Sequence, residues 1–472
     1  MRFLSYYLIK TNTAFQLFPV LLAVVQRCGI LTGDINQTRA FPAELTHLIN
    51  RVLVDNTSNW LNAQDDKSIT LVTDIGTIFG LVITVVLFVA KGGKVRLAGC
   101  ALTTSKSGSD LADLAINTVQ EKAKVPLDTM KRVVGGVCAD GAFVNAPFKE
   151  RCKDLLDNSE LVFKWDLMHL INRTHCNARG LTKSEKEANA AMGDADDQED
   201  ADEPIVDLIV EPIVDLTQAQ TKLITRLLDY VQSQAKKWRS GLDYTRLVVE
   251  TGDFLRPKVM SSTRVSLYEF EQIHRFLQVM KYWDNPWELE VLAQLYCPVL
   301  FAVKIFMKKV QKTEVSAEYV DRVFVKGEGK RSMELALESA IKLSKGHDIE
   351  YLKTTEDCEI LDSKTPFGKE LYMFMKKNSP ILKPSSLTNS NSRTRGTSVI
   401  TFETLVGVLK TFINTFWVEV ARRTCHTELG KDYITFSEAP AETLFSEYKF
   451  ITDHQPSLGF YTVASLIRIG KP

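Results

Sequence analysis

The chain has 472 residues, enough for two or three compact units or for one domain interrupted by a large insertion. Its 58 basic and 58 acidic side chains balance, which excludes a global positive field, so any DNA contact has to come from a local patch. The eight cysteines lie far apart, with no CxxC pair for a zinc site and without the dense spacing of a small disulfide-rich domain, which favours a reducing intracellular compartment. Two apolar runs, 14–25 and 78–90, are shorter than the roughly 20 residues that span a bilayer, so we expect a soluble protein without a membrane segment.

The first third of the chain changes from helical to β spacing. Residues 1–60 carry apolar side chains at helical spacing and are expected to form a packing element. The pattern then predicts five strands, at 69–74, 81–89, 95–103, 133–139 and 161–165, with a helix at 110–124 and another from 167 onward. Three strands in a meander, followed by a helix, a strand, a helix and a further strand, is the order of an RNase H-like sheet. We therefore predict an α/β fold with a mixed sheet.

The remaining two thirds begin with a linker and continue with helices. The acidic composition of 183–203 cannot bury a core and predicts a solvated linker. Helical periodicity then runs from 218 to 423, and two more helices close the chain. We predict an N-terminal helical segment (1–60), a first part of an RNase H-like domain (61–180), an acidic linker (181–217), a large all-α insertion domain (218–430) and the last part of the RNase H-like domain (431–472).

Two aspartates follow predicted strands. Asp74 ends the first strand and Asp140 ends the fourth, and a glycine-containing turn follows each. RNase H-like nucleases hold two divalent cations with carboxylates that converge at one edge of the sheet, and Mg²⁺ prefers such oxygen ligands. Because Asp-Gly after a strand is also a common turn signal, the pattern alone leaves a structural role for either aspartate equally open.

Two motifs stand at the ends of the predicted sheet domain. In the first, a DGA turn at 140–142 precedes 162–172, which reads VFKWDLMHLIN. This motif is similar to the block of the hAT superfamily of transposases in which a DGA turn precedes a CxxHxxN helix. Residues 439–446 read APAETLFS and are followed by Leu458 and an apolar helix, as in the C-terminal signature of the family. The two motifs cover both ends of the predicted sheet domain, and their order matches the family.

The resemblance implies a function, a cofactor and partners. Asp74, Asp140 and Glu442 become an acidic triad that binds Mg²⁺ or Mn²⁺ for DNA strand cleavage and transfer, and the helical insertion explains why Glu442 lies so far along the chain. The family forms dimers through its C-terminal region, which gives Phe445, Leu458, Val463, Leu466 and Ile467 as candidate homodimer contacts. DNA as a partner and a nuclear location follow from the same resemblance.

Several positions depart from the family pattern. Asp166 replaces the cysteine of the CxxH element, while His169 and Asn172 remain, and Asp166 and His169 stand one helical turn apart as a structural pair. Thr263 and Arg264 are candidate DNA contacts, but Val265 replaces the tryptophan expected to stack on a displaced base. An arginine of the C-terminal motif is replaced by threonine, and the chain opens without the zinc finger that usually begins its relatives. These departures favour a domesticated or decayed transposase and leave present enzyme activity open.

A repeat in the linker gives an alternative of another class. The sequence EPIVDL at 203–208 recurs at 211–216, and it resembles a tandem SUMO-interacting motif. Such a segment adds as a strand to an exposed sheet edge. The residues that would bind SUMO are Ile205, Val206, Asp207, Leu208, Ile213, Val214, Asp215 and Leu216. The alternative function is a non-catalytic dimerising scaffold that binds SUMO, or a SUMO-ligase-like adaptor. A drifting duplication in a solvated linker explains the same repeat.

Overall fold

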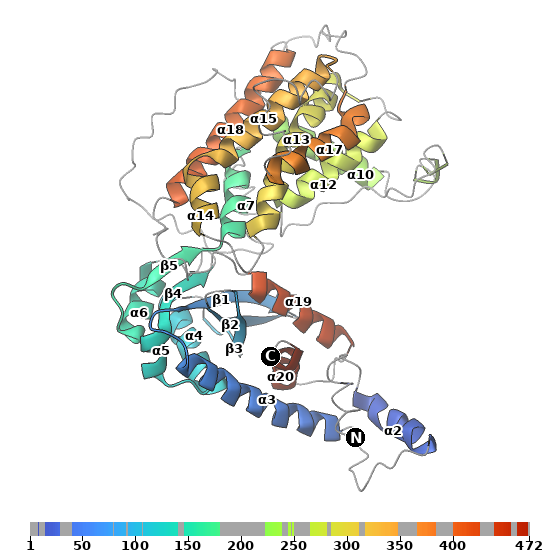
Figure 1. Cartoon of the computed structure of the whole chain (residues 1–472). Helices are drawn as coiled ribbons and strands as arrows, with labels where there is room; N and C mark the ends of the chain where they lie inside the picture. The colour runs from blue at the N-terminus through green and yellow to red at the C-terminus, as the bar shows by residue number, and fades with distance from the viewer. Residues whose placement is uncertain are drawn as a thin grey trace. The chain divides into compact units, whose positions relative to one another are not determined.

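The computed structural model forms two compact units, each described here by itself (Figure 1). One unit consists of Met1–His169, Val310–Ala317 and Thr427–Pro472, and the other of Leu170–Lys309 and Glu318–His426. The structure describes residues 8, 15–28, 40–78, 80–90, 93–105, 107–139, 146–179, 222–237, 244–246, 248–249, 265–280, 285–310, 317–347, 366–383, 400–424, 439–454 and 460–470. Within them the protein is mixed α/β, mostly helical, with one five-stranded sheet.

The sheet lies in the first unit and has the strand order β3-β2-β1-β4-β5. The strands are β1 (Ile69–Ile78), β2 (Leu81–Ala90), β3 (Val95–Leu102), β4 (Val134–Ala139) and β5 (Val162–Trp165). The first three form an antiparallel meander, and β4 and β5 run parallel to β1. All five strands predicted from the sequence are present. A mixed sheet follows because hairpins join the first three strands, whereas helices separate β3, β4 and β5.

The first strand is longer than the sequence predicted. Asp74 was expected to end it, but β1 continues to Ile78 and pairs with β2 as far as Ile78↔Leu81. Only two residues separate the two strands, and one of them, Gly80, has a φ of +77° that side-chain-bearing residues rarely adopt. Asp74 therefore lies inside an antiparallel ladder, opposite Val85. The prediction was wrong because Gly76 was taken as a turn residue, whereas it belongs to the strand.

Side chains that alternate along the strands give the sheet two buried faces. Ile69 and Leu71 point to the face covered by α4 (Gly108–Lys122), α5 (Leu127–Val133) and α6 (Ala146–Leu156). Val72 and Ile78 belong to the opposite face, where α19 (Ala439–His454) and α20 (Phe460–Gly470) complete the core. The C-terminal helices therefore return to the sheet that the first third of the chain builds, and Figure 1 shows the start of α19 beside β1.

The N-terminal segment is helical, as predicted. It contains a single turn η1 (Phe15–Leu17), α2 (Phe18–Arg27) and the long α3 (Ala40–Asn62). Phe18 and Leu22 of α2 form a small cluster with Leu8, against which Phe41 of α3 packs. Helix α3 also packs against α20, which ties the start of the chain to its end within this unit.

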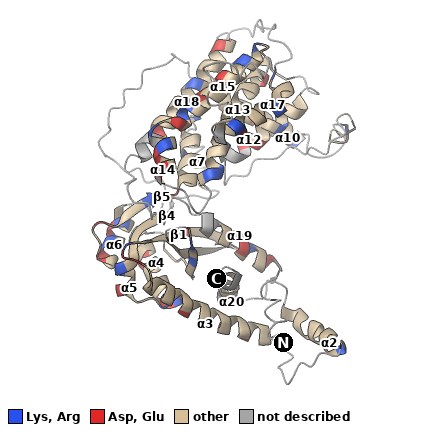
Figure 2. Ribbon diagram, in the orientation of Figure 1, with Lys and Arg blue, Asp and Glu red and all other residues tan. Residues whose placement is uncertain are grey.

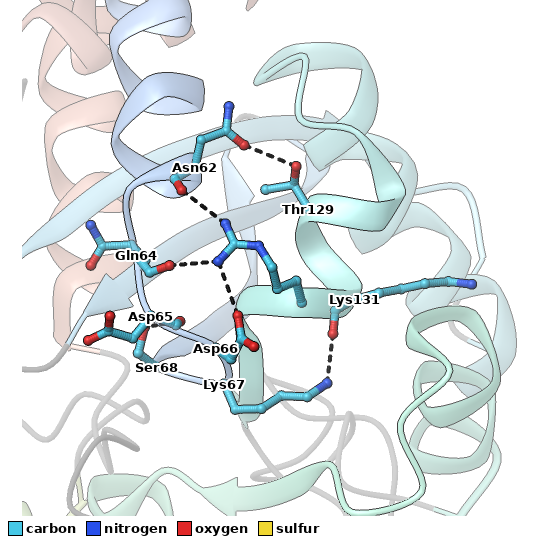
Figure 3. A network of polar contacts seen from close by, with 9 residues as sticks. Asn62, Gln64, Asp65, Asp66, Lys67, Ser68, Thr129 and Lys131 are labelled. Atoms are coloured by element: carbon cyan, nitrogen blue, oxygen red, sulfur yellow. Dashed lines mark hydrogen bonds and ion pairs between the residues drawn. The ribbon is translucent and has the colours of Figure 1, made fainter.

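A network of hydrogen bonds fixes the entry of the chain into β1 (Figure 3). Arg132, at the end of α5, donates to the carbonyl oxygens of Asn62 and Gln64 at 3.0 and 2.8 Å and to the Asp66 carboxylate at 3.2 Å. Lys67 has a φ of +56° and donates from Nζ to the Lys131 carbonyl oxygen at 2.6 Å. One guanidinium thus binds the last carbonyl groups of α3 and holds the loop that starts the central strand.

The second unit is a block of helices. Its members are α7 (Leu167–Ala178, from Leu170 onward), α10 (Leu223–Lys237), α12 (Val265–Val279), α13 (Trp287–Val310), α14 (Ala317–Val320) with the π-helical turn Asp321–Val325, α15 (Glu328–Ser344), α17 (Pro366–Leu382) and α18 (Phe402–Thr424). Helix α13 is at its centre. It is long and apolar enough to cross a membrane by length and composition, but 83% of its apolar window is buried among the other helices. Its hydrophobicity is therefore that of a core helix.

The compact units are divided between His169 and Leu170, so that most of α7 belongs to the helical unit, whereas the sequence assigned residues up to 180 to the sheet domain. Other predictions lie outside the described residues. These are the linker with its repeat, Thr263, Arg264, Asp140 and Leu458.

Candidate functional site

Asp74 lies in the central strand at the point where the parallel ladder with β4 ends. The last described pair of that ladder is Thr73↔Ala139, and the next residues of the two strands in the sequence are Asp74 and Asp140. The Asp74 side chain is 93% buried, being 7% exposed, and its Oδ1 accepts a hydrogen bond from the Ile75 N–H at 2.7 Å. A buried carboxylate is uncommon inside a strand and requires polar partners such as this N–H group.

Helix α19 covers the face of the sheet to which Asp74 belongs. Its residues Ala441, Leu444, Tyr448 and Ile451 are buried together with the inward residues of β1, β2 and β3. Phe445 lies directly on Gly76, two residues beyond Asp74 on the same face of β1. The helix that carries Glu442 is therefore in contact with the strand that carries Asp74.

Two members of the predicted triad have side chains outside the described residues. Glu442 belongs to α19, but only its backbone is described, and Asp140 follows the end of β4. Among the described residues, no group of three or more His, Cys, Asp or Glu side chains is arranged to hold a metal ion. The convergence of Asp74, Asp140 and Glu442 remains a prediction.

Asp166 caps the helix that leaves the sheet. Its backbone N–H donates to the Ala139 carbonyl oxygen at 3.1 Å, just past the end of β5. Its Oδ1 accepts from the backbone N–H of His169 at 2.9 Å, which is the usual contact of an N-cap aspartate with the third residue of the helix. The printed contact of Asp166 is with the His169 backbone, and a pairing of the two side chains stays a prediction. Asn172 lies in the second turn of α7 and is half-buried.

The C-terminal residues assigned to dimer contacts are placed inside the first unit. Val463, Leu466 and Ile467 are at most 2% exposed and pack with the sheet core. Arg468 follows them and donates to Asn50 Oδ1 at 3.0 Å and to the backbone carbonyl oxygen of Ala98. Burial lowers the pKa of Arg468 to about 10. The apolar residues of α20 therefore have an intramolecular role, and a dimer contact through this region remains a prediction.

A buried group of charged side chains in the helical unit was not predicted. His175 Nε2 lies 2.6 Å from Glu269 Oε2, Arg179 forms an ion pair with Glu269 Oε1, and the Tyr296 hydroxyl donates to Oε2 at 3.5 Å. We call these four residues the Glu269 cluster. His175 and Glu269 have no exposed side-chain surface. The cluster joins α7 to α12 and α13, and α12 begins directly after the candidate DNA contacts Thr263 and Arg264.

The ionisation of the Glu269 cluster follows from its partners. Burial alone raises the pKa of Glu269, but the opposite charges of Arg179 and His175 together outweigh it, and the net pKa is below its ordinary value. Burial and the neighbouring Glu269 carboxylate raise the pKa of Tyr296 well above its ordinary value. Glu269 is thus a carboxylate and Tyr296 a neutral phenol. The sequence signal was a histidine and an arginine four residues apart on the predicted helix from 167 onward, for which no role was predicted.

Charges elsewhere are mixed in sign. Figure 2 shows basic and acidic residues interspersed along the helices of both units. On α15, for example, Arg331 forms an ion pair with Glu334 at 3.8 Å, and on the first unit Arg151 pairs with Asp113 at 2.8 Å. The positive side chains of these two pairs therefore lie beside carboxylates.

Comparison with known proteins gave no family: no protein-family model matches the chain, and a search of curated proteins found no significantly similar sequence.

Proposed function

We propose that the chain is a hAT transposase-like protein that retains an RNase H-like nuclease site formed by Asp74, Asp140 and Glu442. The observation that carries the proposal is the parallel ladder of β1 and β4, which ends one residue before both aspartates. Neighbouring parallel strands in register bring residues that follow the same pair to within about 5 Å of each other. The two carboxylates would then share one edge of the sheet.

The architecture supports the same reading. An antiparallel meander followed by two parallel strands, in the order β3-β2-β1-β4-β5, is typical of an RNase H-like sheet. The helical unit stands in the chain between β5 and α19, where an insertion domain of the hAT family would stand. Helix α19 packs on β1, so the third acid would come from a helix on the sheet despite its distance in the sequence.

The residues present fit a magnesium or manganese site. Three carboxylates supply the oxygen ligands and the negative charge that such cations require. The Ile75 N–H donates to Oδ1 of Asp74 and fixes the direction of its carboxylate. When bound, the cations would activate a water or hydroxyl and stabilise the leaving oxygen of a phosphodiester. The protein's own part would be to hold the carboxylates close together on rigid elements.

Two substitutions in the family pattern set an expectation for activity. Val265 begins α12 where a tryptophan would stack on a displaced base, and a valine offers no ring for stacking. Thr443 is exposed on α19 where the family has an arginine, so one positive charge is missing beside the third acid. We therefore propose strand cleavage that is ancestral and much reduced, with metal binding better preserved than transposition.

A plasmid-nicking assay tests the proposal. The full chain should convert supercoiled plasmid to nicked circles in the presence of Mg²⁺ or Mn²⁺, and Asp74→Asn should abolish this. Asp113→Asn is a matched control, because Asp113 lies on α4 at the opposite face of the sheet and pairs with Arg151 on the surface. Equal nicking by the wild type and by Asp74→Asn would show that the activity does not come from this site.

SUMO binding is a second proposal, and it rests on the tandem IVDL repeat at an eight-residue spacing. The flanking acids and alternating aliphatic residues suit strand addition to a basic groove. Isotope-labelled SUMO should show shifts along one sheet edge on titration with the full chain, and replacing Ile213 and Val214 by alanine should weaken them. Unchanged shifts would leave the repeat as a linker duplication.

A further inference from the structure

We infer that Lys164 of β5 supplies an internal positive charge that holds the acidic edge of the sheet together and sets its affinity for a divalent cation. The inference rests on the proposed function, to which it adds a positioning residue. Lys164 has no exposed surface, and it is the only buried lysine among the described residues. Lysine is almost never fully buried without a partner of opposite charge.

Lys164 lies on the same face of the sheet as Asp74. In the register of the parallel strands, Lys164 pairs with Cys138 of β4, and Cys138 pairs with Val72 of β1. Cys138 and Val72 belong to the core between the sheet and the C-terminal helices. Phe163, the neighbour of Lys164, packs on the opposite face. Because side chains alternate along a strand, Lys164 projects from the sheet on the side of Asp74.

Aspartates follow the paired residues of three neighbouring parallel strands. The last register pairs join Thr73 of β1 to Ala139 of β4, and Ala139 to Trp165 of β5. In the sequence, the next residue of each strand is an aspartate: Asp74, Asp140 and Asp166. The Asp166 N–H donates to the Ala139 carbonyl oxygen at 3.1 Å, so the pairing continues up to this residue. Asp74 and Asp166 are the two buried carboxylates among the described residues of the sheet unit.

These charges are close enough to act on one another across the sheet. Neighbouring strands are about 4.8 Å apart and successive residues about 3.3 Å, which puts the Lys164 Cα atom about 7 Å from that of Asp166 and about 12 Å from that of Asp74. At an effective dielectric constant of about 20, two unit charges about 12 Å apart change an equilibrium about tenfold, and closer charges change it more. Within β1, β4 and β5, Lys164 is the one residue with a positive charge.

The charge of Lys164 has two opposite effects on a row of aspartates. Without a metal ion, it offsets the repulsion between buried carboxylates, which would otherwise drive them apart. With a metal ion, it repels the cation, and a unit charge about 10 Å from a divalent ion changes its affinity by roughly a hundredfold or more at the same dielectric constant. A lysine with a purely structural role would have the first effect on stability without the second effect on metal affinity.

The first test is metal-independent and measures hydrogen exchange of the β4 and β5 amides in the full chain. Lys164→Met should reduce their protection about tenfold more in the wild-type background than in the Asp74→Asn or Asp166→Asn background. Asparagine at position 166 removes the charge and keeps the cap of α7. Equal effects of Lys164→Met in all three backgrounds overturn the inference. If Lys164→Met alone does not fold, the addition of Asp166→Asn should restore folding, and a double variant that still fails to fold also overturns the inference.

The second test measures Mn²⁺ affinity and has matched controls. Lys164→Met should bind Mn²⁺ at least tenfold more tightly than the wild type, whereas Lys164→Arg keeps the charge and should bind it as the wild type does. Lys153→Met removes a positive charge from α6, on the opposite face of the sheet, and should leave the affinity unchanged. Equal or weaker binding by Lys164→Met contradicts the inference. If neither the wild type nor Lys164→Met binds Mn²⁺, the proposed function fails, and the exchange test still decides whether Lys164 acts on the aspartates.

Discussion

Removing the carboxylate of Glu269 should destabilise the helical unit strongly. Glu269 is fully buried and accepts contacts from Arg179, His175 and Tyr296. Burial lowers the pKa of Arg179, and the negative charge of Glu269 is the main interaction that raises it again. In Glu269→Ala, the guanidinium of Arg179 stays buried without this negative charge. The helical unit therefore loses stability because a buried charge has no partner, and because removal of the Glu269 side chain leaves a cavity.

Breaking a buried ion pair on one side costs about 3–5 kcal/mol. Three kcal/mol corresponds to roughly a hundredfold change in an opening equilibrium. The double variant Glu269→Leu with Arg179→Met removes both charges and keeps their volume, and such replacements are often neutral or stabilising. We therefore expect a large loss for the single change and a loss below about 1.5 kcal/mol for the double change.

Hydrogen exchange measured by mass spectrometry is the suitable assay, because the chain has two units and one global unfolding energy is not defined. Amides of α7 and α12 should lose protection about a hundredfold in Glu269→Ala, with little loss in β1 and β2 as internal controls. The pH dependence has a fixed sign. Since the folded pKa of Glu269 is lowered, its stabilisation is complete above the unfolded pKa and is lost as the pH falls through the folded value. Unchanged protection of α7 in Glu269→Ala would refute the reasoning.

Two further predictions concern the sheet unit. Arg132→Met should lower the stability of the sheet unit by about 1–2 kcal/mol, because it removes three hydrogen bonds of a partly exposed guanidinium. We expect faster hydrogen exchange that is confined to the amides of residues 62–68. An unchanged exchange rate at these amides would contradict the role of the network. Burial raises the pKa of Cys100 and Cys152 to about 12. Iodoacetamide at pH 8 should therefore label the exposed Cys28 and leave Cys100 and Cys152 unmodified in the native protein. Rapid labelling of Cys100 would show that the core of the sheet unit opens.

The sequence predicted the sheet well because its information is local. Alternating β-branched residues and short turns placed all five strands, and the two C-terminal helices were found from their apolar spacing. The position of Asp74 within its strand was missed, since the two-residue turn containing Gly80 carries a weaker signal than Gly76. The packing of α19 against the sheet was predicted only from the family resemblance, because nothing in the local pattern of residues 439–454 indicates which element they contact.

The Glu269 cluster and the Phe445 contact could not be predicted for a different reason. The partners of Glu269 precede it by 94 and 90 residues, and Gly76 precedes Phe445 by more than three hundred positions. Periodicity within an element reports which side of it is buried and says nothing of the element that covers it. A buried His175 or a glycine inside a strand acquires a meaning only when the contacting element is known.

The most direct test of the central claim is the Mn²⁺ affinity of the full chain, measured by electron paramagnetic resonance, in the wild type and in Asp74→Asn, Asp140→Asn and Glu442→Gln. Three acids that share one site should each lower the affinity at least tenfold, while Asp113→Asn should leave it unchanged. If one of the three, and Glu442→Gln above all, binds Mn²⁺ as tightly as the wild type, the acids do not form one site and the account is contradicted.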